Sequence, residues 1–173
     1  TTTLNLGVGL LGYVNYWGVG YSSTPYINAA LDYSVYKFPD VKGLSIGIGG
    51  YLGWRRTSHS FRTTWRDKNG VWHYDQPVES SWNYIAFGFR PTLHYSFEGT
   101  KAEIYGGLGL GYVIVSYRTN NPDYGYYYNY TYPSYLGYGF FVGGRYFFTN
   151  SFGAYMELGY GMSYLNLGIS LKF

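Results

Sequence analysis

The stretch Leu165-Asn166-Leu167-Gly168-Ile169-Ser170-Leu171-Lys172-Phe173 decides the fold, because it alternates apolar residues with small or polar ones without a break. Successive side chains of a β-strand point to opposite faces, so this spacing predicts a strand with one apolar face and one polar face. The apolar face suits hydrocarbon, whereas the other suits a polar interior.

The same period of two recurs along the chain, which predicts eight strands. We expect them near residues 3–12, 27–36, 44–55, 84–95, 103–114, 136–148, 155–160 and 165–173. Short turns near residues 40, 99 and 150 alternate with loops near residues 18, 68, 126 and 162. This order predicts that residues 1–173 form a single domain of antiparallel, up-and-down strands. Because Pro91 cannot donate a ladder hydrogen bond, we expect a bulge or local irregularity there.

The composition indicates which face meets lipid. Of the 173 residues, 24% are aromatic and only 12% are charged, against about 25% charged in a typical soluble protein. The second face of the predicted strands is mostly glycine and could not solubilise a surface. An eight-stranded interior is only just wide enough for side chains, so it could not hold the large residues of the apolar face. The fold expected is therefore all-β, an eight-stranded antiparallel up-and-down transmembrane β-barrel.

The end of the chain carries a family resemblance. Asn166, Gly168, Leu171 and Phe173 resemble the C-terminal barrel-assembly signal of bacterial outer-membrane barrels. The whole chain resembles the small eight-stranded outer-membrane β-barrel proteins, including those of Bacteroidetes-like bacteria. No basic start or apolar segment precedes the first strand, so we expect that a secretory signal has been removed.

The resemblance implies a location and partners. It implies the bacterial outer membrane, with the long loops extracellular and the short turns and C-terminus periplasmic. The partners implied are outer-membrane lipid and lipopolysaccharide, and the barrel-assembly machinery during insertion.

Five ionisable residues are predicted to face the lumen: Asp32, Arg90, Glu103, Arg145 and Glu157. Charges at membrane depth are tolerated when they face a polar interior and pair with one another. We expect these residues to form a polar network that plugs the barrel, with Arg145 pairing with Glu157 across adjacent strands. The alternative is a polar path for a small solute.

Aromatic residues are expected at the two membrane interfaces and in the loops. Trp54 and Trp82, near strand ends, are predicted to belong to the interfacial girdles. Asn69-Gly70 is a hairpin-tip signal, so the loop around it is expected to extend the barrel strands outward. The candidate partner-binding residues in the long loops are Trp65, Trp72, Tyr124, Tyr126, Tyr127, Tyr128, Tyr130 and Tyr132.

The function favoured by these patterns is non-catalytic, with no cofactor and no metal. We expect a structural or interaction barrel that binds other outer-membrane proteins, as an accessory subunit of a larger complex, and no nucleic acid. One alternative is a narrow channel for small or hydrophobic solutes. Another is a lipid A-modifying enzyme that uses a histidine with a hydroxyl or carboxyl partner. The loop candidates for that chemistry are His59 and His73 with Ser58, Ser60, Asp67 and Asp75, whereas His94 is expected near a short turn.

Overall fold

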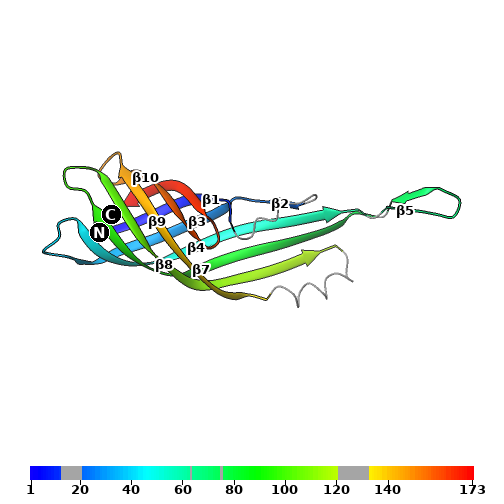
Figure 1. Ribbon diagram of the computed structural model, residues 1–173, viewed down its shortest axis with the longest axis horizontal. Helices are drawn as coiled ribbons and strands as arrows, with labels where there is room; N and C mark the ends of the chain where they lie inside the picture. Colours follow the sequence, from blue (N-terminus) through cyan, green and yellow to red (C-terminus); the bar gives the residue numbers. More distant parts are fainter. Residues whose placement is uncertain (13–20, 63, 75, 121–132) are drawn as a thin grey trace.

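The computed structural model describes residues 1–12, 21–62, 64–74, 76–120 and 133–173 of the chain (Figure 1). The eight main strands are β1 (Thr2–Leu10), β3 (Tyr26–Lys37), β4 (Leu44–Phe61), β7 (Val78–Ser96), β8 (Ala102–Thr119), β9 (Tyr135–Phe147), β10 (Phe152–Tyr160) and β11 (Leu165–Lys172). Three short strands accompany them: β2 (Tyr21–Ser23), β5 (Thr64–Arg66) and β6 (Trp72–Tyr74). Among these described residues there is no helix of the length and apolar character needed to cross a membrane.

The eight main strands close into an antiparallel barrel. Each pairs with the next main strand along the chain, and β1 pairs with β11, for example at Gly7 and Gly168. These pairings include that of β4 with β7, which completes the ring. The predicted fold class, an eight-stranded up-and-down barrel, is therefore confirmed.

The two faces of the wall differ as the alternation predicts. Leu108 and Phe140, on the outer face, are 55% and 61% exposed, whereas Asn5 and Ser170, on the inner face, are fully buried. Inside the barrel, Ser170 Oγ donates a 2.7 Å hydrogen bond to Asn5 Oδ1. A barrel with apolar residues outside and hydrogen-bonded polar residues inside matches a hydrocarbon surrounding.

The wall of the barrel is much taller on one side than on the other. The ladder between β4 and β7 runs from Leu44–Tyr95 to Phe61–Val78, whereas the ladder between β10 and β11 stops at Leu158–Leu165. The small hairpin of β5 and β6 lies beyond the tall side, and both termini lie at the opposite end of the barrel (Figure 1). The turn of that hairpin contains Asn69 and Gly70, and Gly70 has a φ of +83°.

Three local features refine the expectations. At Pro91 the β7–β8 ladder is interrupted between the pairs Phe89–Leu110 and Thr92–Gly107, yet the register does not change. A register shift lies elsewhere, between β3 and β4 at Ser34 and Tyr36. The girdle position expected for Trp82 is wrong. Its side chain lies on the lumen-facing side of β7 and packs inside the barrel with Tyr84, Ala86 and Val113.

Candidate functional site

Charged side chains form a continuous network across the middle of the lumen. Arg90 contacts Asp32 at 3.1 Å and Glu157 at 3.0 Å. Arg145 pairs with the second oxygen of Asp32 and with Glu103 at 2.8 Å. The structure thus brings together all five residues that were expected to face the lumen. The specific pair expected, Arg145 with Glu157, is wrong, because each of these side chains reaches a different partner.

Aromatic rings cover both guanidinium groups. The Arg90 guanidinium lies 3.9 Å from the ring centre of Phe141, and that of Arg145 lies 3.9 Å from the ring centre of Tyr105. The Tyr105 hydroxyl also donates a 3.2 Å hydrogen bond to Glu157. These rings fill the space beside the ions, so the network is held in a fixed arrangement at the centre of the barrel.

A histidine extends the network toward the end that carries the termini. His94 Nδ1 lies 2.9 Å from Glu103 Oε1, and His94 Nε2 lies 2.7 Å from Thr92 Oγ1. When the imidazole donates its Nδ1 hydrogen to Glu103, Nε2 accepts the hydrogen of the Thr92 hydroxyl. A hydroxyl, an imidazole and a carboxylate in this order form the arrangement that activates a nucleophile for acyl transfer.

Strand geometry explains how these groups meet. Thr92 and His94 are two residues apart on β7, so both face the lumen. The short turn between β7 and β8 then pairs Ser96 with Glu103, and Ser96 Oγ donates a 3.3 Å hydrogen bond to Glu103 Oε2. Sequence analysis missed this set, although the spacing Thr92-x-His94 before a tight turn and a lumen-facing glutamate is a signal that could have found it.

A small pocket reaches His94 and Glu103 from the end of the barrel that carries the termini. Its volume is about 110 Å³, and its lining includes His94, Ser96 and Glu103 together with Lys37 and Lys172. His94 and Glu103 therefore adjoin an opening with two lysines, whereas Thr92 lies behind them, buried and outside the pocket lining.

The loop histidines do not form such a set. His73 Nε2 lies 3.2 Å from Asp67 Oδ2, and its ring stacks on Trp65. His59 stacks on Tyr21 with a centroid distance of 4.1 Å. Within the part of the chain that the structure describes, no hydroxyl group hydrogen bonds to either histidine, and neither Ser58 nor Ser60 serves as a partner. Asp75 lies outside the described residues.

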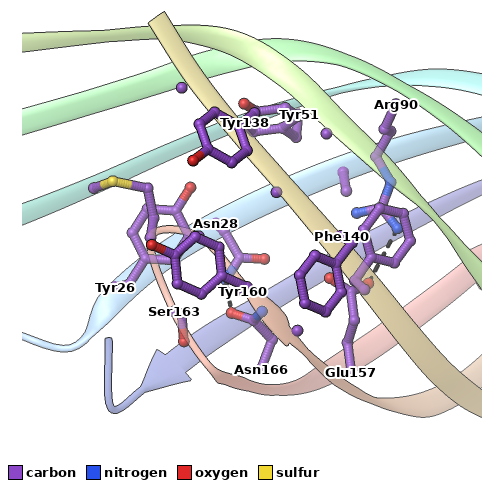
Figure 2. Close-up of a pocket in the computed structure, with 18 of the residues that line it drawn as sticks. Tyr26, Asn28, Tyr51, Arg90, Tyr138, Phe140, Glu157, Tyr160, Ser163 and Asn166 are labelled. Atoms are coloured by element: carbon purple, nitrogen blue, oxygen red, sulfur yellow. Dashed lines mark hydrogen bonds and ion pairs between the residues drawn. The ribbon is translucent and has the colours of Figure 1, made fainter. Parts of the chain in front are cut away.

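A larger cavity occupies the other half of the lumen (Figure 2). Its volume is about 480 Å³, and its floor includes Arg90 and Glu157 of the charged network. Asn28 and Asn166 line its side, where Asn28 Nδ2 donates a 3.0 Å hydrogen bond to Asn166 Oδ1. The charged network therefore separates this upper cavity from the small pocket beside His94.

The remaining candidate residues lie at the ends of the molecule. Trp65 and Trp72 are exposed on the β5–β6 hairpin, where Arg66 lies 5.9 Å from the Trp72 ring. Of the residues likened to an assembly signal, Asn166 faces the lumen, Gly168 pairs with Gly7 and Tyr155 inside the sheet, and Leu171 and Phe173 end the chain. The tyrosines from 124 to 132 that were proposed as a binding loop lie outside the described residues.

Within the described residues, no group of three or more histidine, cysteine, aspartate or glutamate side chains is placed to hold a metal ion.

Comparison with known proteins identifies one family. A family model described as lipid A 3-O-deacylase (PagL) matches residues 43–153, which is more than half of the chain. Among solved structures, the chain is similar to Ail, the attachment invasion locus protein of Yersinia pestis, crystallised with the heparin analogue sucrose octasulfate. That similarity covers 98% of this chain and 94% of Ail at 11% identity, with a TM-score of 0.33. No curated protein gives a significant match.

The family match corrects one expectation. The prediction that this protein is not an enzyme is wrong, because the matched family is described by an enzymatic activity, the removal of an acyl group. The pattern of strands and loops had favoured an interaction barrel because the loop histidines lacked an evident catalytic arrangement. The histidine that does have hydroxyl and carboxylate partners lies inside the barrel.

Proposed function

Since this chain belongs to the lipid A 3-O-deacylase (PagL) family, we propose that it hydrolyses an acyl ester of lipid A, with Thr92, His94 and Glu103 as the reacting set. The protein is an eight-stranded β-barrel of the bacterial outer membrane. The observation that carries the proposal is the hydrogen-bonded series from the Thr92 hydroxyl through the His94 imidazole to the Glu103 carboxylate.

The proposed reaction has two halves. In the first, Thr92 Oγ1 attacks the ester carbonyl carbon while His94 Nε2 takes the hydroxyl proton and then gives it to the departing sugar oxygen. In the second, His94 takes a proton from water, the resulting hydroxide oxygen attacks the acyl-threonine, and Thr92 recovers its proton as the fatty acid leaves. Glu103 holds the tautomer and orientation that this exchange requires and stabilises the imidazolium.

The surroundings of His94 support its role as a base. Arg145 donates to the same oxygen of Glu103 that His94 contacts, so the carboxylate is held in place from two sides. The ring of Tyr105 stacks on His94 with a centroid distance of 5.7 Å. An imidazole whose orientation is set by a carboxylate and a ring needs little rearrangement to reach a reactive geometry.

The access route suggests how the substrate approaches. Lys37 and Lys172 line the pocket beside His94, and ammonium groups attract the anionic headgroups of membrane lipids. We place the termini and short turns on the periplasmic side and the long loops outside, so the ester would enter the lumen from the periplasmic end. Insertion through the barrel-assembly machinery, directed by Asn166, Gly168, Leu171 and Phe173, belongs to the same proposal.

The test is release of fatty acid from purified lipid A by the folded barrel in detergent micelles. We expect Thr92→Val, His94→Gln and Glu103→Gln each to lower the rate by about 10²-fold or more, as removal of a general base or its partner does. Thr57→Val and His59→Gln are matched controls, since both residues lie far from this set, and both should retain the wild-type rate. Phosphatidylcholine offered in place of lipid A shows whether the enzyme distinguishes the two esters.

Two results would overturn the proposal in different ways. A wild-type barrel that releases no fatty acid from lipid A would remove the proposed activity. If His94→Gln hydrolysed lipid A at the wild-type rate, the proposed activity would stand, but its site would lie elsewhere in the protein. Folding of every variant is checked by heat-modifiable electrophoretic mobility.

A further inference from the structure

The upper cavity reaches both faces of one strand. Its lining includes every residue of β9 from Tyr135 to Phe141. Successive side chains of a strand point to opposite sides, so a cavity lined by consecutive residues must pass around the edge of that strand. Gly137 and Gly139 belong to the lumen face, whereas Leu136 and Tyr138 are 81% and 72% exposed on the outer face.

The register of β9 shows where this passage lies. The β9–β8 ladder continues to the pair Tyr135–Val113, but the β9–β10 ladder ends at Phe140–Tyr160. Beyond Tyr160 the chain turns through Gly161 and Met162 and returns as β11, so β9 rises above its neighbour. Among the described residues, this difference in height leaves a notch in the wall above the low side of the barrel.

Aromatic rings form the outer lip of the notch. Tyr160 stacks on Phe140 at 6.0 Å and lies 6.5 Å from Tyr138, as Figure 2 shows for the three labelled rings. These residues belong to the apolar outer face, which meets lipid in an outer-membrane barrel. A notch with this lip would open toward membrane lipid near the aromatic girdle of the barrel.

The cavity behind the notch is suited to an amphiphilic chain. Its volume of about 480 Å³ falls in the range of roughly 300 to 1,000 Å³ that is typical of small-molecule sites. Apolar side chains such as Val113 and Met162 line it. Tyr26 and Tyr51 line it as well (Figure 2). It thus combines hydrocarbon-like walls with a few polar groups.

Two hydroxyl groups in this cavity point to a ligand with hydrogen-bond acceptors. Tyr26 is only 6% exposed, and its hydroxyl has no hydrogen-bond partner among the residues that the structure describes. The Tyr51 hydroxyl likewise has none within the described part of the chain. Both residues line the cavity, so an occupant with hydrogen-bond acceptors could receive a hydrogen bond from each hydroxyl and would be stabilised by it.

We propose that the notch admits one acyl chain of a membrane lipid into the upper cavity, where ester or hydroxyl oxygens on that chain accept hydrogen bonds from Tyr26 and Tyr51. This site is separate from the His94 set, because the ion pairs of Arg90 and Glu157 form its floor. Acyl-chain binding here does not require hydrolysis at His94. It gives the barrel a lateral lipid site that the charged network closes from below.

The test uses photocrosslinking in lipid vesicles that contain the folded barrel. One set of vesicles contains lipid A with a diazirine near the end of one acyl chain, and a second contains phosphatidylcholine with the same labelled chain. Adducts are mapped by mass spectrometry of peptides. We expect adducts on Tyr26 and Tyr51 inside the cavity, in addition to adducts on the lipid-facing residues.

A matched pair of variants separates the cavity from the outer surface. A Cβ on Gly109 would lie 3.6 Å from the Tyr51 ring, so Gly109→Leu fills the cavity without a clash at Cβ. A Cβ on Gly144, which pairs with the outward Ile104 and Met156, would lie 3.8 Å from its nearest neighbour. We expect Gly109→Leu to reduce the cavity adducts at least tenfold and keep the outer ones, whereas Gly144→Leu keeps both.

Each outcome decides the proposal. Cavity adducts in either lipid that Gly109→Leu abolishes support it, and the lipid that gives more of them is the natural source of the chain. Absence of cavity adducts in both lipids, or cavity adducts that persist in Gly109→Leu, would overturn it. Crosslinking measures binding of the acyl chain and does not depend on its hydrolysis. The inactive His94→Gln barrel should therefore give the same adducts as the wild type.

Discussion

Gly47 faces Thr92 across the β4–β7 ladder, and a methyl group on Gly47 would lie within 2.5 Å of Thr92 Oγ1 and 2.8 Å of His94 Nε2. The glycine thus leaves the space in which the Thr92–His94 hydrogen bond forms. Any larger residue at this position has to displace one of the two partners.

This relationship gives the first prediction. Gly47→Ala should separate Thr92 from His94 and lower the rate of fatty-acid release by about tenfold to 10²-fold, since small displacements of reacting groups have effects of that size. Gly144→Ala, on the lipid face with room for a methyl group, is the matched control and should retain the rate. Wild-type hydrolysis by folded Gly47→Ala would show that the Thr92–His94 contact is not used.

The second prediction concerns the charged network. Arg145→Met leaves Asp32 and Glu103 without a shared partner, so it should lower the free energy of unfolding by about 3 to 5 kcal/mol. In the double variant Arg145→Met with Glu103→Gln, the free energy of unfolding should fall by about 0.5 to 3 kcal/mol less than the sum of the two single losses. Urea unfolding from lipid vesicles measures these energies.

The control for this cycle is the pair first expected from the sequence. Arg145 and Glu157 do not contact each other, so the coupling between Arg145→Met and Glu157→Gln should be smaller than that between Arg145→Met and Glu103→Gln. Stronger coupling in the cycle with Glu157 would contradict the pairing described here.

Alternation alone could predict the barrel and much of its lumen. Period-two spacing places Asp32, Arg90 and Arg145 on the inner face, and the structure has them there. Which carboxylate meets which guanidinium could not be predicted, because partners such as Arg90 on β7 and Asp32 on β3 reach across the lumen from strands that are not neighbours. Which side chains meet across the lumen depends on how the strands are staggered in the closed barrel. The residue spacing within one strand carries no information about that stagger.

The candidate site was harder to predict for a related reason. A search for histidines near hydroxyl residues in the loops favoured His59 and His73, whose side chains stack on aromatic rings instead. The contact of His94 with Glu103 depends on the register across a turn, which pairs Ser96 with Glu103 and His94 with Tyr105. A search for residues that face the lumen and lie close in register across a turn would have placed His94 and Glu103 together.

The third prediction tests which face meets lipid. Leu108→Lys places a charge on the outer face and should lower the free energy of unfolding from vesicles by about 2 to 4 kcal/mol. Val71→Lys replaces a residue of similar exposure, 54% against 55%, on the hairpin beyond the barrel and should have little effect. Equal losses for the two variants would count against the assigned lipid face.

The fourth prediction concerns the hairpin tip. A backbone hydrogen bond from Val71, with a further one from the His73 side chain, lowers the pKa of Asp67 below its usual value. The stabilisation that this carboxylate gives the hairpin is therefore complete above the pKa of an unfolded aspartate and is lost as the pH falls through the lower folded value. Hydrogen exchange at the Val71 amide should accelerate over that acidic range in the wild type.

The matching control is Asp67→Asn, in which the acid-dependent acceleration should disappear. Carboxyl carbon shifts of Asp67 in nuclear magnetic resonance spectra report the same titration directly. A Val71 amide whose protection changes with pH identically in both proteins would exclude Asp67 as the cause.

The charged network also has an unequal charge balance. Two guanidinium groups, those of Arg90 and Arg145, face three carboxylates, those of Asp32, Glu103 and Glu157. With a neutral His94 the centre of the barrel therefore holds one excess negative charge, which is enclosed by protein where the dielectric response is weak. When His94 takes the proton of Thr92, the new imidazolium offsets the excess charge of the network, while an equal negative charge develops on the carbonyl oxygen of the substrate. The carboxylates of the network thus stabilise the imidazolium half of the ion pair that forms during the proposed acyl transfer.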